Sequence, residues 1–207
     1  MPASVAIIDY GSGNLRSVSK AFEAVAQGAA VTITDEPAKL AAASHIVLPG
    51  VGAYADCMRG LKAVPGMLAA LEAQVHGAKK PFLGICVGMQ MLFEEGHEHG
   101  VHPGLGWLKG KVVKLQPQGA LKIPQMGWNE LEMQKQHVLL NGVAPGAHAY
   151  FVHSYHAQAH PENLIATVNY GQSIAAVVGQ GHIAGTQFHP EKSQQTGLAL
   201  IRNFINQ

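Results

Sequence analysis

The sequence predicts an α/β fold with a mostly parallel central sheet, flanking helices, and additional antiparallel strands in the C-terminal half. Short apolar runs alternate with amphipathic segments up to residue 93, which is typical of parallel β–α–β units. Beyond Gly96 the chain changes to strand-like runs separated by turn residues. Because 207 residues suit one hydrophobic core and we find no internal repeat or linker, we expect a single domain over residues 1–207.

The first half supplies four predicted strands and the helices between them. We expect strands at 5–9, 30–33, 45–48 and 82–85, and helices at 15–26, 37–43 and 61–76, the last after a break near 65–66. Asn14 or Ser12 is available to cap the first helix. The glycine-rich turn at 11–13 lacks the third glycine of G-x-G-x-x-G, which argues against a dinucleotide site.

The second half predicts further strands and a closing helix. Strand-like runs occupy 107–115, 123–133, 148–155, 164–170, 174–179 and 182–187. Gln180-Gly181 between the last two runs predicts a tight hairpin turn. The segment 193–204 has Leu198, Ile201 and Phe204 on one face, which predicts an amphipathic helix.

Composition argues against several classes of partner. A formal net charge of +1 gives no electrostatic case for nucleic acid or an anionic membrane, and no apolar run reaches transmembrane length. Cys57 and Cys86 are the only cysteines and do not make a disulfide framework, so we expect a reducing, cytoplasmic setting. Charged residues make up only 13% of the chain. Such a weakly charged surface is compatible with a protein partner that covers part of it.

The segment 81–93 carries the candidate nucleophile. An apolar strand runs into Gly84-Ile85-Cys86-Val87-Gly88, a G-x-C-x-G form of the nucleophile elbow. The glycines let neighbouring backbone approach the bend and leave Cys86 at its tip. A helix over 88–93 would place Cys86 at a helix N-terminus, which favours a thiolate. The alternative is an ordinary buried thiol.

Two other segments can serve Cys86. His189 follows a predicted strand, and Pro190 stiffens the turn so that Glu191 can orient the imidazole from the same side. The alternative for His189 is a structural histidine at a strand end. The loop 49–52, Pro-Gly-Val-Gly, offers N–H groups suited to an oxyanion, although a plain strand-to-helix turn explains it equally well.

Together these motifs resemble the class I glutamine amidotransferases of the Cys-His-Glu triad type. Four more segments are similar to the glutaminase subunits of imidazole glycerol phosphate synthase, namely 9–18, 49–52, Pro-Gln-Met-Gly-Trp-Asn at 124–129 and Tyr-Phe-Val-His-Ser-Tyr at 150–155. The resemblance runs from about Val5 to the C-terminus. It implies one glutamine amidotransferase type 1 domain that needs no cofactor or metal and hydrolyses glutamine to glutamate and ammonia through a γ-glutamyl thioester.

The resemblance also implies roles for individual residues. Cys86 would be the nucleophile, His189 the general base and then acid, and Glu191 the carboxylate that orients it. One oxyanion donor would be the Val87 N–H. The second would be the Val51 N–H, if the peptide between Gly50 and Val51 turns it inward, a rotation that Gly50 and Gly52 ease. We hypothesise that the resting peptide points its carbonyl inward and that a ligand on a partner shifts this equilibrium. The residues that match glutamine-holding positions are Gln90, Glu98, Ser154 and Tyr155.

A partner also follows from the resemblance. The family's subunit forms a heterodimer with a (β/α)₈-barrel cyclase, which uses the ammonia to convert PRFAR to imidazole glycerol phosphate and AICAR in histidine biosynthesis. Since 207 residues cannot contain that barrel as well, we expect the cyclase to be a separate chain. Trp128, Tyr150 and Lys192 match interface positions. Alternatively, Trp128 is a core residue, Tyr150 packs within its strand, and Lys192 is a solvated surface charge.

Three other functions remain open at this point. The chain could serve a different synthase, such as that for pyridoxal phosphate, anthranilate or guanylate. It could be a stand-alone cysteine hydrolase, or a catalytically silent binding module.

A cluster after the elbow contains metal-ligand residue types but no fixed ligand spacing, so we expect a solvated loop there; it comprises Glu95, His97, Glu98, His99 and His102.

Overall fold

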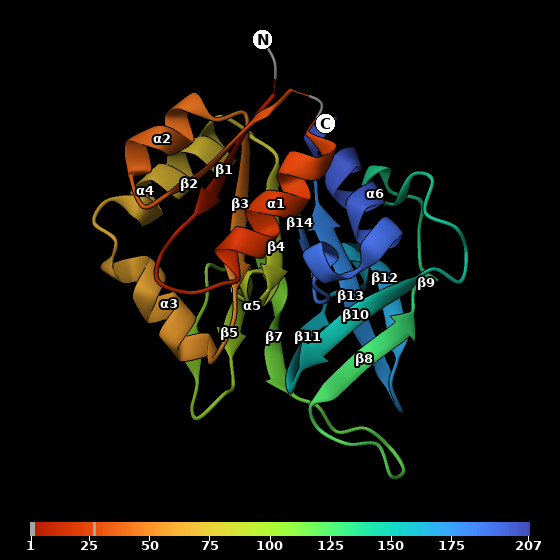
Figure 1. Cartoon of the computed structure of the whole chain (residues 1–207). Helices are drawn as coiled ribbons and strands as arrows, with labels where there is room; N and C mark the ends of the chain where they lie inside the picture. The colour runs from red at the N-terminus through yellow and green to blue at the C-terminus, as the bar shows by residue number, and fades with distance from the viewer. Residues whose placement is uncertain (1–2, 27) are drawn as a thin grey trace.

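The structure, a computed structural model, describes residues 3–26 and 28–207 and is organised around one large sheet. Its eight strands follow the order β2-β1-β3-β4-β14-β13-β12-β9 (Figure 1). The strands are β1 (Ser4–Ile8), β2 (Ala30–Thr34), β3 (His45–Gly50), β4 (Phe82–Cys86), β9 (Glu132–Met133), β12 (Leu164–Asn169), β13 (Ser173–Gln180) and β14 (Ile183–Thr186). Neighbours from β2 to β14 are parallel and the others antiparallel, which confirms the predicted fold class.

The apolar runs explain why these strands lie at the centre. Strands β3 and β4 are buried along their whole lengths, as expected for parallel strands covered on both faces. Strand β2 at the sheet edge is mostly exposed. The tight turn predicted at Gln180-Gly181 joins β13 to β14, with Gly181 at a positive φ of 61°. The strands that lead into the predicted elbow and the loop before it are therefore buried along their whole lengths.

Helices cover both faces of the sheet. Helices α1 (Leu15–Val25) and α6 (Gln194–Ile205) lie side by side on one face (Figure 1), and the rings of Phe22 and Phe204 meet edge to face at 6.2 Å. Right-handed connections between parallel strands place α2 (Pro37–Ala42), α3 (Tyr54–Ala63) and α4 (Met67–Leu71) on the opposite face. A π-helical turn, Glu72–Gly77, extends α4. Within residues 3–26 and 28–207, no helix has both the length and the apolar character needed to cross a membrane.

Two small sheets pack beside the large one. One pairs β8 (Gln125–Glu130) with β10 (His148–His153) in antiparallel fashion. The other has the order β11-β7-β5-β6 and contains β5 (Phe93–Gly96), β6 (His102–Pro103), β7 (Leu108–Lys114) and β11 (Tyr155–Ala159). Short 3₁₀ turns also occur at Val138–Leu140, Pro161–Asn163 and Pro190–Lys192. The strand-like runs predicted after Gly96 therefore belong to several different sheets.

Several predicted elements differ from the observed ones. The helix expected from residue 61 begins earlier, at Tyr54, although the break near residues 65–66 is present, with Gly66 at φ 78°. The helix expected over 88–93 is the short α5 (Val87–Gln90), because the chain turns and enters β5 at Phe93. The predicted loop at 95–102 is partly strand, since β5 pairs with β6. Asn14 occupies the N-cap of α1 without a side-chain capping hydrogen bond.

Candidate active site

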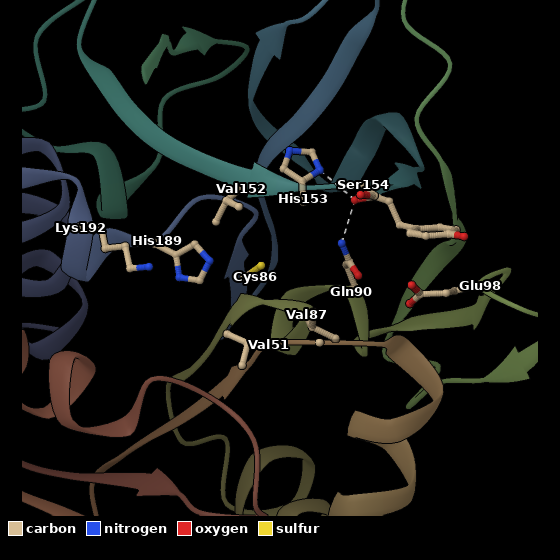
Figure 2. Close-up of a pocket in the computed structure, with 12 residues that line it drawn as sticks. Val51, Cys86, Val87, Gln90, Glu98, Val152, His153, Ser154, His189 and Lys192 are labelled. Carbon is tan, nitrogen blue, oxygen red and sulfur yellow. Dashed lines mark hydrogen bonds between the residues drawn. The ribbon is translucent and has the colours of Figure 1, made fainter. Parts of the chain in front are cut away.

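The candidate site lies where three neighbouring parallel strands end. Strand β4 pairs with β3 on one side and β14 on the other, so Gly50 stands beside Cys86, and Thr186 beside Ile85. The carboxyl ends of parallel strands meet at one sheet edge, where α/β proteins bind ligands. A cavity of about 280 Å³ opens there (Figure 2), lined by Val51, Gly52, Cys86, Val87, Gln90, Glu98, Val152, His153, Ser154, Tyr155, His189 and Lys192. Gly50 and Glu191 are not among these lining residues.

The bend at Cys86 has the strained geometry of a nucleophile elbow. Cys86 adopts φ 55° and ψ −112°, a conformation that a non-glycine residue takes only when its surroundings impose it. A Cβ on Gly88 would lie 1.8 Å from the Leu48 carbonyl oxygen, and one on Gly84 would lie 2.5 Å from the Gly88 carbonyl oxygen. Both glycines are therefore sterically required. Since α5 has only four residues, Cys86 gains little from a helix macrodipole.

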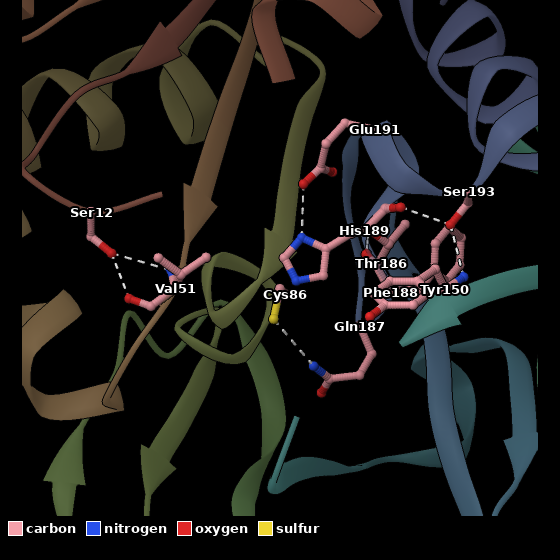
Figure 3. Close-up of polar contacts among 10 residues, drawn as sticks. All are labelled: Ser12, Val51, Cys86, Tyr150, Thr186, Gln187, Phe188, His189, Glu191 and Ser193. Atoms are coloured by element: carbon pink, nitrogen blue, oxygen red, sulfur yellow. Dashed lines mark hydrogen bonds and ion pairs between the residues drawn. The ribbon is translucent and has the colours of Figure 1, made fainter. Parts of the chain in front are cut away.

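His189 lies between Glu191 and Cys86 (Figure 3). Its Nδ1 is 2.8 Å from Glu191 Oε1, and the two side chains are only 4% and 1% exposed. Burial acts to lower the pKa of His189, but hydrogen bonding and charge from Cys86 and Glu191 dominate and raise it to about 10. The imidazole thus holds a proton at neutral pH and can pair with a Cys86 thiolate.

Hydrogen bonds to its backbone fix the position of His189. The His189 N–H donates to the Tyr150 carbonyl of β10 at 3.1 Å. The Ser193 hydroxyl donates to the His189 carbonyl at 2.7 Å and accepts from the Tyr150 N–H at 2.9 Å. Ser193 is fully buried at the start of α6, and sequence reasoning gave it no role in the site. These contacts tie the turn that carries His189 to two neighbouring elements (Figure 3).

The loop after β3 has its second predicted oxyanion donor turned away. The Val51 N–H donates to Ser12 Oγ at 3.1 Å, and Ser12 Oγ donates to the Val51 carbonyl at 2.7 Å. Cys57 Sγ lies 3.3 Å from the same carbonyl. Because a trans peptide holds N–H and C=O on opposite sides, the Gly50 carbonyl points away from Ser12. The Val87 N–H, at the first position of α5, has no intrahelical partner, and Val87 is one of the residues that line the cavity.

Glycines shape this loop for two different reasons. A Cβ on Gly50 would lie 2.7 Å from the Gly88 nitrogen and 2.8 Å from Tyr10 Oη, so the close approach excludes a side chain. Gly52 has φ 93° and open space around its Cβ position, so its requirement is conformational. Val51 between them is 42% exposed. The loop is therefore tightly packed at Gly50 and free to rearrange from Val51 onward.

Polar side chains form the far wall of the cavity. Gln90 Nε2 donates to the Tyr155 carbonyl at 2.9 Å. His153 Nδ1 donates to the same oxygen at 2.8 Å, and burial lowers the pKa of His153 to about 4, so its ring is neutral at pH 7. Glu98 Oε2 accepts from the Tyr54 N–H at 2.7 Å. The structure thus brings all four predicted glutamine-holding residues to one wall and adds His153, which sequence reasoning missed.

Tyr150 lies between the other two predicted interface residues, Trp128 and Lys192, and Lys192 lines the cavity. The rings of Trp128 and Tyr150 meet edge to face at 5.9 Å, and Lys192 Nζ lies 5.9 Å from the centre of the Tyr150 ring. Trp128 is 45% exposed, so the alternative of a core residue is wrong.

In the cluster after the elbow, His97 and Glu95 pair with each other. His97 Nε2 lies 2.7 Å from Glu95 Oε1, so a local hydrogen bond satisfies both groups.

Known proteins resemble this chain over nearly its whole length. The family described as "Glutamine amidotransferase class-I" matches residues 6–207. The imidazole glycerol phosphate synthase subunit HisH of Agrobacterium fabrum is 56% identical, and that of Rhodospirillum rubrum 52% identical, each over 97% of both chains. A solved structure described as PurLQS from Thermotoga maritima has 21% identity and a TM-score of 0.75, covering 100% of this chain and 99% of that one. Another, described as a glutamine amidotransferase, has 19% identity and a TM-score of 0.75, covering 98% and 97%.

The two solved structures establish similarity of fold, and the family match together with the relatives at more than 50% identity establishes descent. The residues that the family match spans include the elbow, the loop 49–52 and the His-Pro-Glu turn. The chain therefore belongs to the class-I glutamine amidotransferase family.

Proposed function

We propose that the chain is the glutaminase subunit of an imidazole glycerol phosphate synthase, and that Cys86, His189 and Glu191 hydrolyse glutamine to glutamate and ammonia. The observation that carries this proposal is the buried contact of His189 with Glu191 at 2.8 Å, directly beside the strained elbow cysteine. The relatives at 52–56% identity bear the name of that synthase subunit, which supports the choice of pathway. The ammonia passes to a separate cyclase subunit.

The chemistry follows from the proton positions. The Cys86 thiolate attacks the γ-carbonyl carbon of glutamine, and the protonated His189 gives its proton to the departing nitrogen, which leaves as ammonia. The neutral imidazole then takes a proton from water, whose oxygen attacks the thioester carbon. Glutamate departs as the C–S bond breaks, and the thiolate–imidazolium pair is restored. Glu191 holds the ring in the tautomer that presents Nε2 to sulfur in both steps.

Charge that develops on the carbonyl oxygen needs two donors. Val87 lines the cavity and its N–H has no intrahelical partner, which supports it as the first donor, whereas the Val51 N–H is bound to Ser12. We propose that the chain alone therefore rests in a weakly active state, and that a liganded cyclase favours rotation of the Gly50–Val51 peptide. Only a difference in affinity for the two loop conformers is needed.

We propose that the cyclase binds against the cluster formed by Trp128, Tyr150 and Lys192. Trp128 is 45% exposed, and Met126, two residues earlier in β8, is 63% exposed. Together they form exposed apolar surface that a partner can cover. Lys192 both touches Tyr150 and lines the cavity. A partner seated there would lie next to the point where ammonia is released.

The test is glutamate release from glutamine by the purified chain alone, with the cyclase, and with the cyclase plus PRFAR. We expect weak activity alone, a rise with the liganded cyclase, loss in Cys86→Ala and His189→Ala, and full activity in His160→Ala, since His160 is an exposed histidine outside the cavity. Full turnover by Cys86→Ala would refute the proposed chemistry. Equal rates in all three wild-type mixtures would refute the proposed partner while leaving Cys86 catalytic.

A further inference from the structure

Gln187 is a buried polar residue beside the nucleophile to which neither the triad nor the sequence motifs assign a role. Its side chain has 0% exposure. Its N–H donates to the Ala176 carbonyl of β13 at 2.9 Å, which keeps the backbone aligned with the sheet. Since Thr186 pairs with Ile85, the next residue, Gln187, stands level with Cys86. The sheet itself therefore sets the position of this amide.

The two ends of the Gln187 amide contact two different site residues. Gln187 Nε2 points at Cys86 Sγ from 3.8 Å (Figure 3), and Gln187 Oε1 accepts from Gln90 Nε2 at 3.1 Å. Turning the Gln187 amide by 180° would bring the NH₂ groups of Gln187 and Gln90 face to face, so the hydrogen that Gln90 now donates to Gln187 Oε1 would lose its acceptor. The hydrogen-bond network therefore fixes which end faces the sulfur.

Gln90 is oriented by the same contact. Its NH₂ group donates both to the Tyr155 carbonyl at 2.9 Å and to Gln187 Oε1 at 3.1 Å, so both of its hydrogens are used. The remaining polar atom, Gln90 Oε1, is left as an acceptor on a residue that lines the cavity (Figure 2). A bound glutamine offers N–H donors on its ammonium and its carboxamide, and either one suits this acceptor.

We propose that Gln187 is a positioning residue that couples the substrate contact to the nucleophile. Its N–H stabilises the Cys86 thiolate, and its carbonyl holds Gln90 with Oε1 toward the substrate. Cys86 is only 4% exposed, so a thiolate there depends on protein donors in place of water, and Gln187 supplies one beside the charge on His189. This inference rests on the proposed role of Cys86 as the attacking group.

The test compares Gln187→Met, which keeps the length of the side chain and removes both polar ends, with Asn163→Leu, a buried-amide control outside the cavity. The rate of Cys86 alkylation by iodoacetamide is measured against pH, with mass spectrometry separating Cys86 from Cys57. We expect the midpoint of the profile to move up by about one pH unit in Gln187→Met, because a charge-assisted donor is lost. The profile of Asn163→Leu should superimpose on that of the wild type.

Steady-state kinetics with the cyclase and PRFAR add a second readout. Gln187→Met should lower kcat and raise KM for glutamine, each by roughly three- to tenfold. Gln90→Met should raise KM to a similar extent but move the alkylation midpoint less than Gln187→Met does, because the Gln187 amide remains beside Cys86 and loses only the partner that orients it. A purely structural role for Gln187 would not separate the two variants in this way.

A measurement on the wild-type chain guards against misfolding of the variant. The side-chain amide resonances of Gln187 should titrate with the same midpoint as Cys86 alkylation, because the N–H responds to the charge on sulfur. Absence of that titration, or an unchanged alkylation profile in folded Gln187→Met, would overturn the inference. The Cys86→Ala variant separates failure of this inference from failure of the proposed function. If Gln187 fails these tests and Cys86→Ala is inactive, only the role of Gln187 is overturned. If Cys86→Ala turns over glutamine normally, the proposed function itself has failed.

Discussion

Ser12→Ala should increase the glutaminase activity of the chain in the absence of any partner. Ser12 Oγ accepts the Val51 N–H at 3.1 Å, and rotation of the Gly50–Val51 peptide must break that bond. A hydrogen bond of this kind contributes about 0.5–1.5 kcal/mol net, which corresponds to a roughly two- to tenfold change in the population of the rotated state. The variant should show a gain of that size. The gain would be larger if rotation also breaks the 2.7 Å bond from Ser12 Oγ to the Val51 carbonyl.

The assay is glutamate release by the free chain at saturating glutamine, with Ser173→Ala as a control for the loss of an exposed serine hydroxyl. Activity with the cyclase and PRFAR should change less than the basal activity, because the partner already favours the rotated state. The ratio of stimulated to basal rate therefore falls. A basal rate equal to or below that of the wild type, with unchanged Tm, would show that Ser12 does not hold the inactive conformer.

Three other changes test separate parts of the structure. Glu191→Gln should lower the His189 titration midpoint seen by NMR and reduce kcat/KM roughly a hundredfold, since a neutral amide no longer stabilises the imidazolium; an unchanged midpoint would contradict this. Gly88→Ala should lower the free energy of unfolding by about 3 kcal/mol, because its Cβ would lie 1.8 Å from a β3 carbonyl oxygen. Gly77→Ala is the control, with its nearest atom at 4.0 Å, and equal Tm values would refute the clash. Trp128→Ala should weaken cyclase binding by roughly ten- to hundredfold in calorimetry while leaving the Tm of this half-exposed site nearly unchanged; unchanged affinity would exclude Trp128 from the interface.

Local patterns were sufficient to predict the elbow and the strands around it. The buried strands β1, β3 and β4 need apolar runs, and the reversal at Cys86 needs glycines on both sides, so both features are visible within a few residues of sequence. The His-Pro-Glu turn is equally local, because the contact between His189 and Glu191 spans only two positions. These features depend on backbone geometry near the residues themselves, and the sequence therefore encodes them in short motifs.

Contacts between distant segments were not predictable in the same way. Ser12 was considered only as a helix cap, yet its hydroxyl binds Val51, 39 positions away. Gln187 contacts a cysteine 101 positions away, and nothing in its neighbourhood distinguishes it from an ordinary strand-end amide. Such partners depend on the order of strands in the sheet, and a single sequence does not specify that order through local periodicity. The early end of α5 has the same origin, since Phe93 leaves the helix to pair with β7.

The strand order also separates the rigid and the adjustable parts of the site. Cys86, the proposed nucleophile at the end of β4, lies between β3 and β14, and His189, the proposed base, follows β14 in a turn tied to β10 and α6 by Ser193. The triad side chains are buried, so a rearrangement there would disturb the core. Val51, by contrast, is 42% exposed and held by a single hydroxyl through its N–H. A signal that arrives at the surface can therefore change the oxyanion donors at small energetic cost, whereas changing the triad would require repacking three strands. For this reason we expect variants that uncouple the chain from its partner to map to the β3 loop and its contacts, and variants in the triad to abolish activity with and without the partner alike.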